Sequence, residues 1–201
     1  MGRPSNTIQR QQEIIDGLLV VMSEKGYEKA SIQAIANAAD MLPGLIHYHF
    51  KSKQGILLSL VSQLTESRKE RYEVLSGVAT NTQERLGAFI ESRLNMDDES
   101  VSNFVPTWVM ICSEAAKQKE VKVIYQQSIE EQLDLLQGLL LDAAIENGQT
   151  FTVRRARGLA AAALSLIEGA YTISIAAGDV LPENYAVGQL KAMLALRLGY
   201  R

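Results

Sequence analysis

The chain has 201 residues, of which 47% are hydrophobic, and its 20 Lys and Arg against 23 Asp and Glu give a net charge of −3. This composition excludes a disordered chain, and the near balance of charge excludes a protein that is basic over its whole surface. The single cysteine, Cys112, excludes a disulfide-rich secreted protein and every zinc site built from several cysteines.

Charge is divided unevenly along the chain. Residues 1–71 carry nine basic and seven acidic side chains, whereas the remainder carries 11 basic and 16 acidic ones. The positive excess suggests that the first third meets an anionic partner. The apolar stretch at 158–178 is rich in alanine and interrupted by Glu168, so we expect helix packing there and no membrane partner. The N-terminus lacks the apolar core of a signal peptide, so we expect a cytoplasmic protein.

Apolar residues recur three and four positions apart along most of the chain, and no alternating strand pattern is present. The sequence therefore predicts an all-α fold of about nine helices. The first helix is expected from Thr7 to Lys25, followed by two short helices at 31–38 and 43–49. Longer helices are expected over 52–77, from Asn81, from near Ser100, over 119–147, from Thr152 to Gly178, and after Pro182.

Short helices at the N-terminus, with a tight break between the second and third, are typical of a helix-turn-helix motif. In this motif the last helix enters the major groove of DNA. The break falls at Asp40, a residue type that tolerates left-handed backbone better than most. Leu42 precedes the third helix and cannot cap it, because its side chain accepts no hydrogen bond.

The stretch Ser31 to Lys53 resembles the TetR family of transcriptional regulators. The match is carried by Ile35-Ala36, by the block Gly44-Leu-Ile-His-Tyr-His-Phe50 and by the following Lys51-Ser52-Lys53. The resemblance implies a DNA-binding domain over 1–53, which is a three-helix head, and a helical ligand-binding and dimerisation domain over 54–201. Asp40 stands where the family usually has glycine, and Leu42 where it often has serine.

The resemblance also implies which residues contact DNA. Tyr48 and the two histidines beside it would donate hydrogen bonds to phosphate, and Lys53 would pair with phosphate. Gly44 would allow close approach to the groove, and Arg3 would belong to a flexible arm on the DNA. The ordinary alternatives are exposed polar side chains, a helix-packing ring and a solvated lysine. The expected contact residues are Arg3, Ser31, Gln33, Pro43, Gly44, Leu45, His47, Tyr48, His49 and Lys53.

In this family the middle helices enclose a mostly apolar ligand cavity. A carboxylate such as Glu114 together with Trp108 could hold a cationic ligand through cation–π attraction. Pro106-Thr107-Trp108 followed by a long helix faintly resembles the choline-responsive branch of the family, which by itself names no ligand. Plain core packing is the alternative for each expected lining residue: Phe89, Met96, Phe104, Trp108, Ile111, Cys112, Tyr125 and Tyr171.

The resemblance assigns dimerisation to the last two long helices, at about 152–178 and 183–198. They would pack with a second copy into a four-helix bundle. Ordinary packing within one chain is the alternative for the residues concerned, which are Ala160, Ala163, Leu164, Ile167, Leu190 and Leu194.

These features predict a sequence-specific regulator, a repressor that an unidentified small molecule releases from a palindromic double-stranded DNA operator. An activator or a regulator without an effector remains an alternative of the same fold, and a small all-helical enzyme is a further one. Against an enzyme, the sequence has no phosphate-cradling glycine loop and no zinc signature. His47 and His49 are two apart on a helix and cannot easily share a metal ion. We expect no catalytic residue, metal or cofactor.

Overall fold

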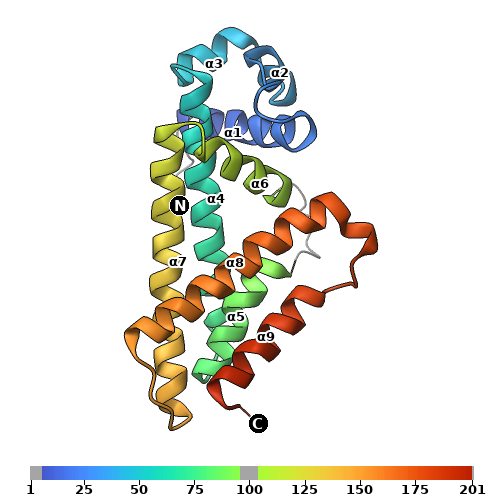
Figure 1. The fold of residues 1–201 in the computed structure, drawn as a ribbon. Coiled ribbons are helices and arrows are strands. Elements are labelled where there is room, and N and C mark those ends of the chain that lie inside the picture. Colours follow the sequence, from blue (N-terminus) through green and yellow to red (C-terminus); the bar gives the residue numbers. More distant parts are fainter. Residues whose placement is uncertain (1–5, 96–103, 201) are drawn as a thin grey trace. The chain divides into compact units, whose positions relative to one another are not determined.

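The computed structural model describes residues 6–95 and 104–200 (Figure 1). Over these ranges the chain forms nine α-helices and one short 3-10 helix and contains no strand, which confirms the predicted all-α fold. The elements are α1 (Asn6–Lys25), α2 (Ile32–Ala38), α3 (Pro43–His49), α4 (Lys53–Ser76), α5 (Thr82–Leu94), α6 (Phe104–Ala115), α7 (Lys119–Glu146), α8 (Val153–Ala177), η2 (Gly178–Val180) and α9 (Tyr185–Leu198).

Capping side chains begin four of the helices where the sequence indicated. Ser31, Ser52, Asn81 and Thr152 each accept a hydrogen bond from the backbone N–H three residues later, at 3.1, 3.1, 2.8 and 3.2 Å. Such bonds satisfy donors that a helix start leaves unpaired. The expected start at Thr7 was wrong, since this residue lies inside α1, whereas α9 begins at Tyr185, after Pro182 as expected. The start expected near Ser100 lies outside the described residues.

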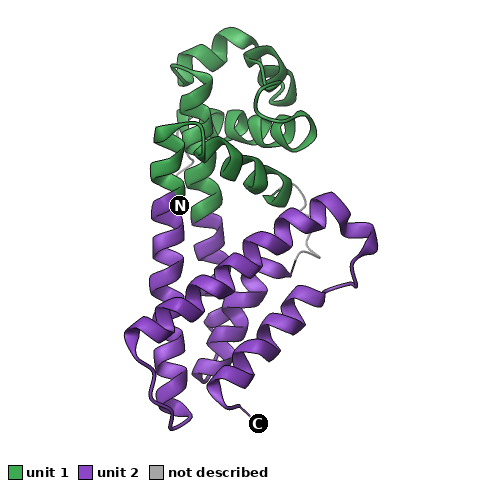
Figure 2. Ribbon diagram, in the orientation of Figure 1, with its two compact units in different colours: residues 1–65, 100–125 green, residues 66–99, 126–201 purple. Residues whose placement is uncertain are grey.

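The chain divides into two compact units, coloured separately in Figure 2. Unit 1 comprises residues 1–65 and 100–125 and holds α1, α2, α3, α6 and the first half of α4. Unit 2 comprises residues 66–99 and 126–201 and holds α5, α8, α9 and most of α7. The division into domains 1–53 and 54–201 is a statement about function and remains a proposal.

The helices of unit 1 bury a common apolar core. Ile14, Leu18 and Met22 recur every four residues on α1 and are fully buried. Each large aliphatic side chain removed from water in this way contributes about 1.5–3 kcal/mol. α1 packs against α2, α3 and α6. The other buried aliphatic residues of this unit include Ile35, Ala36, Ile46, Ile56, Leu57, Leu60 and Val61. This core thus fixes the positions of the short helices α2 and α3.

In unit 2, α8 and η2 form the longest apolar segment of the described chain. By length and composition alone the segment Val153–Val180 could cross a membrane, and 33% of its most apolar window is buried within the chain. One face of α8 packs against α5 and α9. Near its C-terminal end α8 is exposed on all sides, and Ile173 and Ile175 are 46% and 49% exposed there.

Candidate nucleic-acid interface and sensor region

Asp40 forms the turn between α2 and α3. Its φ of 51° lies in the left-handed region, as the sequence predicted for an aspartate in place of glycine. α3 begins after Leu42, which makes no side-chain capping bond, and Pro43 occupies the first turn, where its missing N–H leaves nothing unpaired. α3 is therefore held by this turn and by the buried side chain of Ile46.

α3 presents large side chains to solvent. Tyr48 is 81% exposed, Leu45 is 40% exposed, and His47 is exposed between them. A Cβ atom at Gly44 would meet nothing within 4 Å, so packing within the described chain does not require glycine there. A bare backbone at this position lets another molecule approach closely. We call the surface formed by Pro43, Gly44, Leu45, His47 and Tyr48 the α3 face.

The remaining expected contact residues have partners in the protein or lie elsewhere. Ser31 uses its hydroxyl to cap α2, and Gln33 donates to the side chain of Asn37 at 2.8 Å. His49 is half-buried, and its ring meets that of Tyr48 edge-on at 5.0 Å. The Nδ1 atom of His49 is buried with no hydrogen-bond partner among the described residues. Arg3 lies outside the described residues.

Lys53, the first residue of α4, is turned toward the protein. Its Nζ donates to the backbone carbonyl of Tyr27 at 3.0 Å and lies 4.2 Å from the centroid of the same residue's ring. Tyr27 is in the turn between α1 and α2, 26 residues earlier in the chain. No motif in the sequence indicated this contact.

Within unit 1, the end of α6 and the start of α7 contact the same region of the head. Burial raises the pKa of the Tyr27 phenol, the Glu114 carboxylate raises it further, and a hydrogen bond with Gln118 opposes the rise. Gln118 donates to Glu114 at 2.7 Å, and Gln54 of α4 donates to Gln118 at 3.5 Å and to Glu120 at 3.3 Å. A polar network thus joins the end of α6 to Tyr27, which precedes the helix-turn-helix in the chain, and to Gln54, which follows it.

Three of the expected ligand-lining residues form an aromatic cluster in unit 1. Trp108 of α6 is fully buried and stacks on Phe104 with ring centroids 5.7 Å apart and planes 9° apart. Tyr125 of α7 lies 5.4 Å from Trp108, tilted by 33°. Ile111 is buried on the same helix, whereas Cys112 is exposed. A cation is attracted to the free face of an aromatic ring, most strongly to that of tryptophan.

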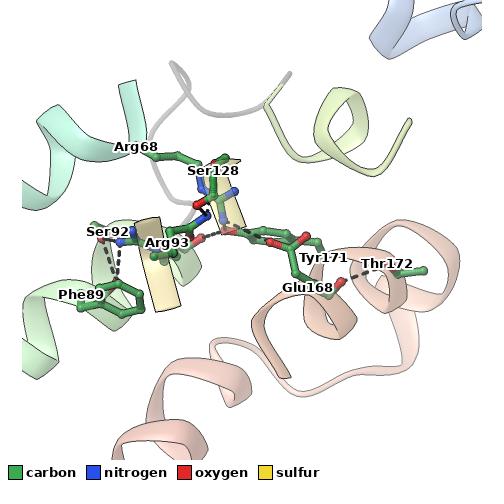
Figure 3. Close-up of polar contacts among 9 residues, drawn as sticks. Arg68, Phe89, Ser92, Arg93, Ser128, Glu168, Tyr171 and Thr172 are labelled. Carbon is green, nitrogen blue, oxygen red and sulfur yellow. Dashed lines mark hydrogen bonds and ion pairs between the residues drawn. The ribbon is translucent and has the colours of Figure 1, made fainter. Parts of the chain in front are cut away.

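Phe89 belongs to unit 2, where it packs against a buried arginine (Figure 3). The Arg93 guanidinium lies 3.7 Å from the centroid of the Phe89 ring. Its Nε donates to Gln132 at 3.0 Å and its Nη1 donates to Ser92 at 2.6 Å. Burial lowers the pKa of Arg93 to about 9, helped by the nearby charge of Arg68. Met96, also expected to line the ligand cavity, lies outside the described residues.

Tyr171 joins the same cluster from α8. Its hydroxyl donates to the backbone carbonyl of Arg93 at 2.8 Å and accepts from Arg68 at 3.4 Å. Arg68 also pairs with Glu168 at 3.4 Å. The cluster therefore ties α4, α5, α7 and α8 together inside unit 2, as Figure 3 shows for its labelled side chains. Sequence reasoning named Phe89 and Tyr171 only as ligand-lining residues and missed the cluster, because its members are scattered over more than 100 residues.

The residues expected at the dimer surface all lie inside unit 2. Their exposed fractions are at most 4%, which matches the alternative of packing within one chain. They are Ala160, Ala163, Leu164, Ile167, Leu190 and Leu194. The large apolar residues that α8 and α9 leave exposed are others, and they include Ile173, Ile175, Met193 and Leu196.

Unit 2 also contains a cavity of about 610 Å³ beside α5 and α9. Its lining includes Leu86, Ile90, Leu194 and the ion pair of Lys191 with Glu91. None of the residues expected to bind a ligand lines this cavity. Among the described residues, no group of three or more His, Cys, Asp or Glu side chains is arranged to hold a metal ion.

Both parts of the chain match known families. Residues 14–60 match bacterial regulatory proteins of the tetR family, and residues 82–199 match the C-terminal region of BetI-type transcriptional repressors. The HTH-type transcriptional regulator BetI of Rhizobium meliloti (strain 1021) is 27% identical over 194 residues, which cover 91% of this chain and 90% of that protein. BetI of Serratia proteamaculans (strain 568) is 30% identical over 122 residues, covering 58% and 60%.

Solved structures share the fold. A transcriptional regulator from Rhodococcus sp. Rha1 has a TM-score of 0.81 at 20% identity and covers 94% of this chain and 96% of its own. A transcriptional regulator from Saccharomonospora viridis, in complex with choline, has a TM-score of 0.79 at 18% identity, covering 96% and 97%. The predicted family is confirmed, and its members are DNA-binding regulators rather than enzymes. The chain belongs to the TetR family of transcriptional regulators and carries a C-terminal region of the BetI type.

Proposed function

We propose that this regulator is a homodimeric repressor that leaves its operator when a small organic cation binds. The observation that carries the proposal is the cluster of Phe104, Trp108 and Tyr125 in the same compact unit as the helix-turn-helix. An activator of the same fold would use the same sites with the opposite effect on transcription.

The α3 face is the proposed surface for reading DNA. His47 and Tyr48 would donate to phosphate, Leu45 would contact a thymine methyl group, and Gly44 would let the helix enter the major groove. Ser31, Gln33, Pro43 and His49 would lie at the edge of this contact, and Arg3 would follow the DNA as an arm. The exposure of Tyr48 and the open space at Gly44 support this assignment, since neither is explained by packing.

The proposed effector carries a quaternary ammonium group. The relative from Saccharomonospora viridis is in complex with choline, and this chain groups three aromatic rings, a residue type whose faces bind such cations. Each ring face contributes about 0.5–2 kcal/mol to binding a cation, more when water is excluded. Trp108 is fully buried, and Glu114, buried at the end of the same helix, supplies negative charge.

The polar network at the end of α6 is the proposed route from effector to DNA. Trp108 and Glu114 are on one helix, and the hydrogen bond of Gln118 and the charge of Glu114 reach Tyr27 beside the head. An effector that favours a different position of α6 would change the population of heads that fit the operator. The DNA is released if the effector binds more tightly to the state whose heads do not fit the operator than to the state whose heads do.

A second copy of the chain is the proposed partner of the open surface of α8 and α9. Family members typically dimerise, and Ile173, Ile175, Met193 and Leu196 leave apolar area for such a contact. The same contact would account for the long apolar helix without a membrane, so we place the protein in the cytoplasm. Two-fold pairing suits a palindromic operator with half-sites about 34–36 Å apart.

The test uses the chain's one tryptophan, Trp108, as a reporter. Choline is titrated into the protein while its fluorescence and the anisotropy of bound labelled DNA are followed. We expect choline to change the fluorescence and to lower DNA affinity at the same concentrations. Replacement of half-buried Tyr125 by alanine should weaken both responses, whereas replacement of exposed Cys112 by serine should leave them unchanged. DNA binding that ignores choline, with no fluorescence change, would overturn the choice of effector.

A further inference from the structure

Lys53 is held on two sides by a single residue. Its ammonium donates to the Tyr27 carbonyl at 3.0 Å and lies 4.2 Å from the Tyr27 ring. The carbonyl also accepts from the backbone N–H of Ala30 at 3.1 Å, so the turn that carries it is itself fixed. The ammonium therefore occupies a built position between a carbonyl dipole and an aromatic face, both of which attract cations.

The start of α4 explains why Lys53 needs such a position. Partial positive charge gathers at the N-terminus of a helix, so a cation there is unfavourable without an acceptor. The first turn of α4 contains no acidic residue that could supply one. Tyr27 provides the acceptor from a different part of the chain.

Contacts with other residues hold the Tyr27 side chain in place, so it would not move outward together with Lys53. Its side chain is half-buried, with the Glu114 carboxylate nearby and a hydrogen bond with Gln118. The ring is thus set against the end of α6 and the start of α7, and it stays in place if the lysine turns away. Any outward movement of Lys53 would give up both the carbonyl contact and the ring contact.

The contact also closes the segment that reads DNA. Residues 27–53 contain all of α2 and α3, and the bond between Lys53 and Tyr27 joins the two ends of this segment. Only residues 50–52 separate the end of α3 from Lys53. A small change in the contact between Lys53 and Tyr27 therefore changes the position of the α3 face.

We propose that Lys53 is a positioning residue that sets the angle of α3 through Tyr27, and that it does not neutralise a DNA phosphate. Family resemblance alone assigns it to phosphate. The two roles differ in a measurable way, because each phosphate neutralised by a protein cation adds about 0.9 to the slope of log affinity against log salt concentration.

The experiment compares Lys53→Met, Tyr27→Leu, the double variant and Lys51→Gln in the full-length chain. Affinity for one DNA duplex is measured by anisotropy at several salt concentrations, without any effector. Lys51 is exposed two residues away and is the control for removing a positive charge near α3. Tyr27→Phe keeps the ring and is the conservative control. Circular dichroism and thermal melting establish that each protein compared is folded.

We expect Lys53→Met to lower affinity with an unchanged salt slope. Tyr27→Leu should lower affinity by a similar factor, the double variant should lose no more than either single one, and Tyr27→Phe should stay near wild type. Such non-additivity is the mark of two residues acting as one contact. A slope reduced by about 1 per head in Lys53→Met would overturn the proposal. Wild-type affinity in Tyr27→Leu would overturn the proposal as well. The Tyr27 variant tests the proposal by itself if the Lys53 variant does not fold.

Discussion

Gly17 of α1 lies against the backbone of Ile35 in α2. A Cβ atom at Gly17 would stand 2.9 Å from the Ile35 carbonyl oxygen and 3.1 Å from the Cβ of Ala39. Real Cβ atoms do not come this close to a backbone oxygen, so the two helices can approach only because residue 17 is glycine. This contact fixes α2 against α1 and, through the turn at Asp40, sets the position of α3.

Gly17→Ala should therefore destabilise the protein by about 1–3 kcal/mol, the usual effect of overpacking a tight contact. Alanine favours helix more than glycine does, so helix propensity alone predicts the opposite sign. Urea unfolding followed by circular dichroism measures the difference. An unchanged or higher stability would show that α1 and α2 can move apart at residue 17 without any loss of folding free energy.

Gly44→Ala is the matched change at a glycine with open space around it. We expect stability to stay the same or to rise by up to about 1 kcal/mol, because alanine loses less backbone entropy in a helix. DNA affinity should fall, since the added methyl group stands on the α3 face. Anisotropy and urea unfolding on the same preparation separate the two effects. Full DNA affinity in this variant would remove Gly44 from the proposed contact.

Leu42→Ser should stabilise α3. Leu42 is the N-cap residue, makes no capping bond and is 74% exposed, so its replacement loses little packing. A serine hydroxyl there can accept from the free N–H groups of the first turn, which adds about 0.5–2 kcal/mol. Thermal melting compares the variant with wild type. A lower melting temperature would mean that Leu42 makes a contact that its exposure does not suggest.

Glu84 gives a stability that depends on pH. Hydrogen bonds from the backbone N–H and the hydroxyl of Thr80, at 2.7 and 3.0 Å, hold the pKa of this carboxyl below its usual value of 4.5. A lowered carboxyl pKa stabilises the fold above the unfolded value, and this stabilisation is lost as the pH falls through the folded value. Glu84→Gln should therefore be less stable than wild type at pH 7, and the gap should close once the pH has fallen below the lowered folded-state pKa. Glu70→Gln, at an exposed position of α4, serves as the control, and an equal gap at both pH values would contradict the assignment.

Leu196→Glu should abolish the dimer. Leu196 is 81% exposed on α9, so a charge there disturbs nothing inside one chain but would be buried without a partner in a dimer. Sedimentation should give a monomer for this variant and a dimer for wild type. Val74 of α4 is similarly exposed but lies outside the proposed surface, so Val74→Glu is the control and should remain a dimer. A dimeric Leu196 variant would exclude this face of α9.

Local signals in the sequence predicted local structure well. The caps at Asn81 and Thr152, and the helix end at Gly26, where φ is 80°, depend on residues within one turn of each other. The left-handed turn at Asp40 follows from the same short range of interactions. The family motif likewise located the α3 face, because that motif is contiguous in the chain.

Contacts between distant residues could not be predicted in this way. Lys53 meets Tyr27 across 26 residues, and Tyr171 meets Arg68 across 103, with no motif to connect them. For α8, the sequence is apolar or small on most sides, so periodicity could not say which face packs inside the chain. The expected dimer residues of α8 are buried within the chain for this reason.

The most direct test of the central claim is the affinity for DNA from immediately upstream of the regulator's own gene, measured by anisotropy at several salt concentrations. Unrelated duplex DNA serves as competitor, and Tyr48→Ala is compared with wild type. We expect the upstream DNA to bind at least about a thousandfold more tightly than unrelated DNA, with Tyr48→Ala weakening binding while the protein stays folded. Equal affinity for both DNAs, or a Tyr48 variant that binds as tightly as wild type, would contradict recognition through the α3 face.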